Sequence, residues 1–516
     1  MRTATLVYAG SLTDYAFMPL GGGESAYERA LAFAAQVPGS SDTFILAGKV
    51  ALPPGAPPSV RKESWTRKEV LAEAEVFAAR LRAEGRPLDA LVMIRADEPF
   101  LDPALLERML DNYRRYRAEY SFADGFPAGF AAEIIHPRIL PTLVALSEKA
   151  PGEPDRGWLF KVVQKDINAF DIETEISPKD LREFRLDLAC DTKRNHLLVE
   201  RLLDAGVHDA ASGLGLIPER LELQRTLPAF VQVQVTGGCP QVCANCPYPQ
   251  FGGDILARKD FMPRERYAQL MRGLVEFCGD AVVDISLWGE ASFHPDIEGL
   301  IDETLSKPGL SLIVETSGLG WKRETLERLA SRYRENLHFI VSLDACEPVL
   351  YEKLRGPGFD EALSTAELLL GLFPKTAYVQ TLRTKDNEES LEAFWRGWKK
   401  RTENVIVQKY SNFAGSLPER GVCDLSPLVR RPCWHLKRDL SILIDGKVPL
   451  CRDCVGKDII LGDLFSGEAE SLSPRLAEVW AAGDPWHLEH IQAGLRTESA
   501  YPEPCAVCSE YYTYNA

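Results

Sequence analysis

The sequence predicts an α/β protein with two successive domains built on parallel sheets and a small cysteine-bearing tail. Strand-like apolar runs alternate with helical segments in both halves of the 516-residue chain, and this alternation is typical of right-handed β-α-β units. One group of cysteines lies in mid-chain and another near the C-terminus. We therefore expect a first domain at 1–212, a linker at 213–228, a core at 229–420 and a tail at 421–516.

Composition narrows the class of protein. No run of 18 or more apolar residues occurs, and Met1-Arg2-Thr3-Ala4 leads directly into a strand-like run, so neither a membrane span nor a secretory signal is expected. The 12 cysteines are too sparse for a disulfide scaffold, and their clustering favours metal binding in a reducing, cytoplasmic setting. The formal net charge of -16 argues against nucleic acid as a partner, because such binding requires basic groups that neutralise phosphates.

The first domain shows a doubly wound pattern. Strands are expected at 4–8, 43–46, 90–94, 120–123 and 184–188, and helices at 25–36, 68–84, 103–117 and 192–205. The Pro-rich stretch 50–59 is expected to be a loop, and the segment from Leu216 to Pro228 a linker.

Two segments of this domain resemble GT-A-like (Rossmann-like) nucleotidyltransferases. They are Leu91–Pro99, an apolar strand that ends in Asp97, and the later run Arg185-Leu186-Asp187-Leu188. The resemblance implies that Asp97 and Asp187 together hold Mg2+, which prefers carboxylate oxygens beside phosphates. The glycine run Gly21–Gly23 could present backbone amides to an anion, but it lacks the lysine of those enzymes.

The core predicts a partial (β/α)6 barrel. Six strands are expected at 230–236, 282–287, 310–316, 337–343, 377–382 and 405–410, with helices at 264–277, 321–333, 351–372 and 390–400. Ligand-binding groups in barrels of this kind lie at the carboxyl ends of the strands. All six expected strands end in polar or glycine residues, although ordinary turn chemistry also favours such residues there.

Cys239, Cys243 and Cys246 follow the first core strand in a C-x3-C-x2-C pattern. Three thiolates on one loop can hold three irons of a cubane cluster and leave the fourth without a protein ligand. Half of a zinc site is the alternative, but zinc ligands usually come in C-x2-4-C pairs. This spacing resembles the signature of the radical S-adenosylmethionine (SAM) superfamily, in which a [4Fe–4S] cluster binds SAM and one electron cleaves it to methionine and a 5′-deoxyadenosyl radical.

The same resemblance implies roles for strand-end residues. Trp288-Gly289-Glu290 stands at the position of the family's G-G-E motif, so Glu290 is expected to bind the SAM ammonium. Ser317, Ser342 and Asp344 stand where the family contacts the SAM carboxylate and ribose. The residue before the third cysteine is usually aromatic and packs on adenine. It is Asn245 here, and Tyr248 is the candidate replacement.

The tail carries a second group of cysteines. Cys433 and Cys451 flank an expected hairpin, 440–444 and 447–450 around Asp445-Gly446, and the pair Cys505 and Cys508 follows. The pattern Cys433-x12-Gly446-x4-Cys451 resembles the opening of SPASM and Twitch extensions, and it implies an auxiliary [4Fe–4S] cluster with these four cysteines as ligands. The eight residues that follow Cys508 contain no cysteine, so one such cluster is expected. The alternative is a zinc site formed by Cys451, Cys454, Cys505 and Cys508. Cys423 is assigned to neither site.

The order of the three parts resembles the spiro-SPASM family over the whole chain. It implies a radical SAM enzyme that abstracts hydrogen from a small-molecule, glycan or peptide substrate in an oxidation or crosslink, with flavodoxin or ferredoxin as reductant. No catalytic residue that acts on the substrate is identified. The alternatives are a nucleotidyl- or glycosyltransferase with a structural metal, and a noncatalytic iron–sulfur electron carrier.

Overall fold

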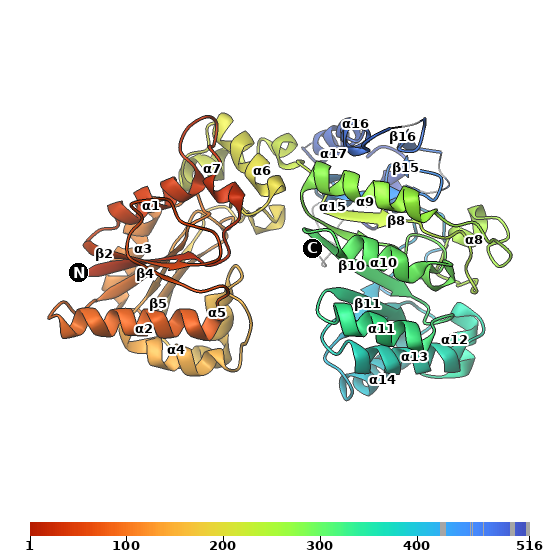
Figure 1. The fold of residues 1–516 in the computed structure, drawn as a ribbon, viewed down its shortest axis with the longest axis horizontal. Coiled ribbons are helices and arrows are strands. Elements are labelled where there is room, and N and C mark those ends of the chain that lie inside the picture. Colours follow the sequence, from red (N-terminus) through yellow and green to blue (C-terminus); the bar gives the residue numbers. More distant parts are fainter. Residues whose placement is uncertain (424–429, 455, 457, 468, 496–500, 512–516) are drawn as a thin grey trace. The chain divides into compact units, whose positions relative to one another are not determined.

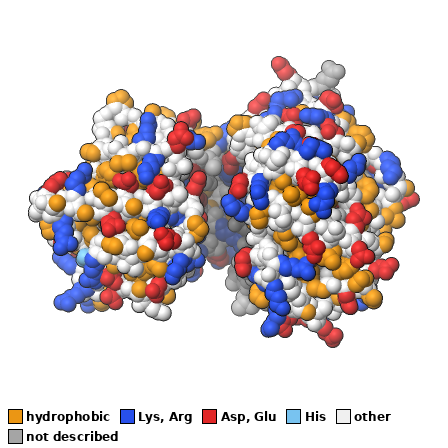
Figure 2. Space-filling view, turned by 60° about the horizontal axis from the view of Figure 1, so that its bottom comes forward, with side chains coloured by type: hydrophobic (Ala, Val, Ile, Leu, Met, Phe, Trp, Pro, Cys, Tyr) orange, Lys and Arg blue, Asp and Glu red, His pale blue; other side chains and the backbone are white. Residues whose placement is uncertain are grey.

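The computed structural model describes residues 1–516 except 424–429, 455, 457, 468, 496–500 and 512–516. The chain divides into two compact units, Met1–Thr226 and Leu227–Ala516 (Figure 1). On the face drawn in Figure 2, acidic and basic side chains are interspersed over both units. No helix among the described residues is long and apolar enough to cross a membrane.

The first unit is built on a seven-stranded sheet. Its strand order is β3 (Ser59–Arg61), β2 (Ser40–Ala47), β1 (Thr3–Ala9), β4 (Ala90–Arg95), β6 (Glu133–Ile135), β5 (Tyr120–Asp124) and β7 (Ile172–Ile176). Only β6 runs antiparallel to its neighbours. Its helices are α1 (Ala26–Gln36), α2 (Arg67–Ala83), α3 (Pro103–Tyr116), α4 (Leu140–Ser147), α5 (Trp158–Val163), α6 (Lys193–Asp204) and α7 (Ala210–Leu216).

Local capping explains why the expected helices begin where they do. Ser25 with Glu28, and Thr66 with Glu69, form capping boxes that satisfy the first free amides of α1 and α2. Helices α2, α4 and α5 pack against one face of the sheet, and Figure 1 shows α1 on the other side.

Two features of this unit differ from expectation. The expected strand 184–188 is absent, and a 3-10 helix at Arg182–Phe184 and a single bridge at Asp187 take its place. The reason is that Arg185 adopts a positive φ of 48°, which breaks an extended run. The edge position is filled by β7. The expected linker 213–228 contains the last turn of α7 and a 3-10 helix at Leu221–Gln224.

The second unit contains the six strands expected for the core, all parallel. They are β8 (Phe230–Val233), β9 (Ala281–Asp284), β10 (Leu310–Thr316), β11 (Leu337–Ser342), β12 (Ala377–Arg383) and β13 (Val405–Lys409). Helices α8 (Tyr248–Phe251), α9 (Arg264–Cys278), α10 (Ile297–Leu305), α11 (Arg323–Tyr333), α12 (Pro348–Arg355), α13 (Phe359–Leu372) and α14 (Glu388–Lys399) connect them. The single helix expected at 351–372 is two helices, because Pro357 has no amide hydrogen and Gly356 and Gly358 have positive φ.

The tail differs most from expectation. It comprises α15 (Trp434–Arg438), β14 (Asp439–Ile442), β15 (Lys447–Pro449), β16 (Ile460–Asp463), α16 (Ser473–Ala481) and α17 (Asp484–Leu495). The predicted turn forms, with the Leu443 amide donating to the Lys447 carbonyl at 2.8 Å, but the prediction that its two flanking strands pair with each other was wrong. Instead, β14 pairs in parallel with β8 and β15 pairs with β16. A tail strand therefore extends the core sheet, across the expected boundary at 420/421.

Candidate functional site

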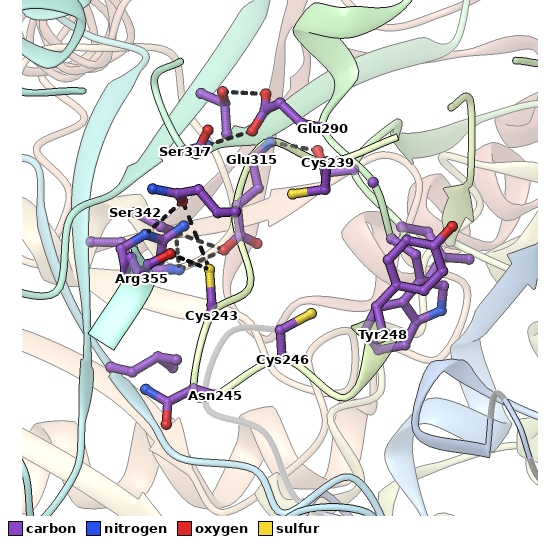
Figure 3. Close-up of a pocket in the computed structure, with 18 of the residues that line it drawn as sticks. Cys239, Cys243, Asn245, Cys246, Tyr248, Glu290, Glu315, Ser317, Ser342 and Arg355 are labelled. Carbon is purple, nitrogen blue, oxygen red and sulfur yellow. Dashed lines mark hydrogen bonds between the residues drawn. The ribbon is translucent and has the colours of Figure 1, made fainter. Parts of the chain in front are cut away.

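The three mid-chain cysteines lie on the loop that follows β8, and Figure 3 shows their sulfur atoms directed toward one shared space. Backbone hydrogen bonds fix this loop at three points. The Cys239 amide donates to the Ile255 carbonyl at 3.0 Å, the Ala244 amide to the Leu354 carbonyl at 2.8 Å, and the Cys246 amide to the Cys243 carbonyl at 3.2 Å. The cysteine positions are thus set by the backbone.

Burial makes these thiols poor acids in the absence of a metal. It raises the pKa of Cys239 to about 12 and also raises the pKa values of Cys243 and Cys246. Desolvation disfavours the thiolate, and a bound metal reverses this preference because it deprotonates its thiol ligands outright. Three convergent thiols, with no fourth cysteine among the described residues that line the cavity, fit a cluster with one open iron.

Glu290 lies in the same cavity and its carboxylate is held rigidly. Its Oε1 accepts a hydrogen bond from the Thr316 hydroxyl at 2.6 Å, and its Oε2 accepts one from the Ser317 amide at 2.7 Å. The side chain is 4% exposed. A carboxylate has about four acceptor sites, so Glu290 can still accept hydrogen bonds from a ligand.

Gly289 brings Glu290 to this position. Its φ is +79°, and a Cβ placed there would lie 2.1 Å from the Thr236 carbonyl oxygen. Only glycine fits such a close approach of two backbone segments. A hydrogen bond of 2.8 Å from the Glu290 amide to the Gly238 carbonyl holds these two backbone segments together.

The other expected SAM contacts line the same cavity. Ser342 donates to a Glu315 carboxylate oxygen at 3.0 Å. Asp344 accepts from the Leu382 amide and from Arg355, both at 2.7 Å. The Ser317 hydroxyl accepts from the Leu319 amide at 3.2 Å. These side chains are therefore oriented by the protein before any ligand arrives.

Tyr248 is held within an aromatic cluster beside the cysteine loop. Its hydroxyl donates to the Gly237 carbonyl at 2.9 Å and accepts from the Gln234 amide at 3.1 Å, and Trp288 stacks on it with ring centroids 6.0 Å apart. The Tyr248 ring is 3% exposed, whereas Trp288 is only partly buried. Sequence reasoning did not consider Trp288 as an aromatic wall of the cavity.

Sequence reasoning also missed several charged groups of the cavity. Arg355 ends α12, and its Nη1 pairs with Asp344 at 2.7 Å. The break at Gly356-Pro357 was the available signal, because helices end in basic residues before glycine. Asp284 ends β9, and burial raises its pKa to about 6. Arg452 reaches the cavity from the tail, and no local sequence signal predicts this position.

The tail cysteines surround a second, enclosed cavity. All four expected ligands line it: Cys433, Cys451, Cys505 and Cys508. Cys454 lines it as well, and its sulfur is 3.5 Å from that of Cys451. Cys423 is exposed and is not part of this wall. His490 completes the wall and is fully buried beside Cys505.

In the first unit, the two aspartates expected to hold Mg2+ do lie close together, but an arginine lies between them. Arg156 Nε is 2.5 Å from Asp187, and its Nη2 is 3.4 Å from Asp97. The same guanidinium also contacts Asp191 at 3.0 Å and Glu98 at 3.1 Å. A fixed cation therefore occupies the space between the two carboxylates.

Comparison with known proteins gives matches for the second unit and for most of the chain. Residues 233–395 match the family model described as the Radical SAM superfamily. A protein of Treponema pallidum (strain Nichols), described as uncharacterized, is 34% identical over 371 residues, which is 69% of this chain and 98% of that protein.

Two solved structures are also similar. One is BtrN in complex with AdoMet and 2-DOIA, with a TM-score of 0.38 and 15% identity over 55% of this chain and 93% of that one. The other is SuiB of Streptococcus suis bound to the precursor peptide SuiA, with a TM-score of 0.39 and 14% identity over 73% of this chain and 84% of that one.

Proposed function

We propose that the second unit, whose residues 233–395 match the Radical SAM superfamily model, cleaves SAM at a [4Fe–4S] cluster held by Cys239, Cys243 and Cys246. The chain belongs to one family with the T. pallidum protein. The observation that carries the proposal is the convergence of three thiols on a cavity whose other walls are preorganised polar groups. When bound, cluster and SAM supply a 5′-deoxyadenosyl radical that removes a hydrogen atom from a substrate.

The protein's part in this reaction is to position its ligands. Glu290, fixed by Thr316 and Ser317, is suited to accept hydrogen bonds from the SAM ammonium. Ser317, Ser342 and Asp344 are the candidates for the carboxylate and ribose. We assign the adenine-stacking role to the cluster of Tyr248 and Trp288, with Trp288 as the more accessible ring.

The cavity also has polar lining residues that are the proposed candidates for substrate contact. Its lining includes Asp284, Glu315, Gln232, Gln380 and Gln408. These side chains can exchange many hydrogen bonds with a ligand, so they favour a polar substrate rich in hydroxyl or amide groups. Small carbohydrate-like molecules, glycans and peptides all belong to this class.

The tail cavity is the proposed auxiliary metal centre. A [4Fe–4S] cluster on Cys433, Cys451, Cys505 and Cys508 is supported by the burial of Cys433 in the cavity wall. The 3.5 Å separation of the Cys451 and Cys454 sulfurs favours the zinc alternative, since two thiolates on one tetrahedral zinc lie about 3.8 Å apart. Metal analysis separates the two: a second cluster gives about eight irons per chain, whereas the alternative gives about four irons and one zinc.

The central test is anaerobic reconstitution, reduction with dithionite or flavodoxin, and measurement of 5′-deoxyadenosine with SAM present. Cys239→Ala is expected to lose the product and about four irons per chain. Cys346→Ala, at an exposed cysteine outside both cavities, is the matched control and should behave as wild type. Full SAM cleavage by the Cys239 variant would overturn the ligand assignment.

A further inference from the structure

The first unit contains a cavity of about 330 Å³ that no step of the proposed reaction uses. It lies where β1 and β4 end, with Tyr8 from β1 and Arg95 and Glu98 at the end of β4 among its walls. Trp158 and Phe160 of α5 close another side. A cavity of this size accommodates a small organic molecule.

Neither arginine of the cavity wall has a free face for an anion. The guanidinium of Arg156 already pairs with four carboxylates, including those of Asp187 at 2.5 Å and Glu98 at 3.1 Å. Arg95 donates to Asp97 at 3.3 Å, to the Pro154 carbonyl at 3.2 Å and to the Ser11 hydroxyl at 2.9 Å. A phosphate needs uncommitted donors, so the cavity is poorly suited to a nucleoside phosphate.

Acidic side chains outnumber basic ones in the wall. Glu98, only 7% exposed, uses Oε1 to accept from Arg156. Glu133 uses Oε1 to accept from the Tyr120 hydroxyl. Among the described residues neither carboxylate has a partner for its second oxygen. Two further acidic groups of the wall are already paired, Asp124 with Arg182 and Asp155 with Arg67.

Burial favours the protonated, neutral forms of these two carboxyl groups in the absence of a ligand, so a bound cation would release their protons. It raises the pKa of Glu98 to about 8, and it also raises the pKa of Glu133. A desolvated carboxylate gains most from a cation brought next to it, because water no longer screens the attraction.

Aromatic rings form the rest of the wall. Phe122 and Phe160 have ring centroids 4.8 Å apart, and Tyr120 stacks on Phe122 at 5.5 Å. Trp158 is 5% exposed and faces the same cavity. The negative faces of such rings attract organic ammonium groups and pack against the carbon atoms attached to them.

We propose that this cavity binds a small organic cation, an amine whose ammonium group pairs with a carboxylate of the wall, that of Glu98 or Glu133, and whose carbon body packs on the rings of Phe122, Trp158 and Phe160. The Arg156 guanidinium takes the place that a divalent ion would need between Asp97 and Asp187. The first unit is therefore a binding domain for an amine, and the nucleotide–Mg2+ chemistry suggested by its sequence does not take place there.

The test is isothermal titration calorimetry on the full-length protein with four probes. Choline and glucosamine are the organic cations, N-acetylglucosamine is the neutral counterpart of the second, and CTP with Mg2+ tests the nucleotide alternative. At least one cation is expected to bind, and N-acetylglucosamine and CTP with Mg2+ are not. At least one of the variants Glu98→Gln and Glu133→Gln should weaken binding about tenfold or more, as expected for loss of an ionic contact in a buried site.

Glu148→Gln is the control, because Glu148 is an exposed residue of the same unit whose side chain is 64% accessible. Thermal unfolding confirms that each variant is folded, and the yield of 5′-deoxyadenosine, which depends on the other unit, should not change. The proposal is overturned if neither cation binds, if binding persists in both variants, or if CTP with Mg2+ binds instead. These outcomes leave the SAM assignment untouched, so the two proposals fail independently.

Discussion

Gly289→Ala tests whether the position of Glu290 matters for SAM cleavage. The new Cβ would lie 2.1 Å from the Thr236 carbonyl oxygen, where ordinary contact begins at 3.4 Å. The two backbone segments must therefore separate by about 1.3 Å (3.4 minus 2.1). The φ of +79° costs alanine about 1–2 kcal/mol, and overpacking adds about 1–3 kcal/mol. The expected loss of unfolding free energy is thus about 2–5 kcal/mol.

Two assays separate stability from function. Urea unfolding of the apoprotein reports the free-energy loss, and 5′-deoxyadenosine yield from reconstituted protein reports the chemistry. A displacement of about 1 Å in a positioning group lowers rate about 100-fold, so a drop of that size is expected while the protein is still folded. Gly467→Ala is the matched control: its φ is +68°, but its Cβ would meet only Arg475 Nη2 at 3.7 Å. It should show the backbone penalty and wild-type cleavage. Wild-type cleavage by folded Gly289→Ala would refute the role given to Glu290.

Three further predictions follow from the second unit. Arg355→Met leaves Asp344 buried without its partner at 2.7 Å and should lower the free energy of unfolding by about 3–5 kcal/mol. The control Arg396→Met breaks an exposed pair with Glu392 and should change the free energy of unfolding by less than about 1 kcal/mol. Equal effects of the two variants would contradict the stabilising role of the buried Arg355–Asp344 pair. Because the pKa of Asp284 is raised from 3.8 to about 6, its ionised form disfavours the folded state, so apoprotein stability should fall by about 2 kcal/mol between pH 4 and 6. Asp284→Asn should remove this slope in urea titrations, and an unchanged slope would contradict the assignment to Asp284. Cys505→Ala should lower the metal content of the tail but keep SAM cleavage, with turnover of substrate lost, and loss of cleavage itself would show that the tail centre is needed at the barrel.

The sequence predicted the six core strands because each is a short apolar run bounded by turn residues, and this pattern is local. The polar residues at strand ends follow from the same reasoning, since parallel strands bring their carboxyl ends to one edge. Cys239, Glu290, Ser342 and Asp344 consequently line one cavity in the structure.

What sequence reasoning missed depends on pairing between distant segments. Asp445-Gly446 does form its turn, but β14 gains more by joining β8 at the edge of a large sheet than by pairing with β15, and a local rule cannot weigh that competition. Arg452 enters the cavity for the same reason, since only the folded tail places it there. In the first unit, Arg156 lies far in sequence from Asp97 and Asp187, so comparison of the two short motifs could not predict that an arginine lies between these aspartates.

The pairing of β14 with β8 also limits how this protein can be divided. Truncation before the tail would strip one neighbour from β8 and leave a row of unpaired amides and carbonyls, a surface prone to aggregate. The same two strands lead to both cysteine groups, since Val233 precedes Cys239 and Cys433 precedes Asp439 by six residues each. If both proposed metal centres form, their attachment next to two hydrogen-bonded strands of one sheet would hold the distance between them constant.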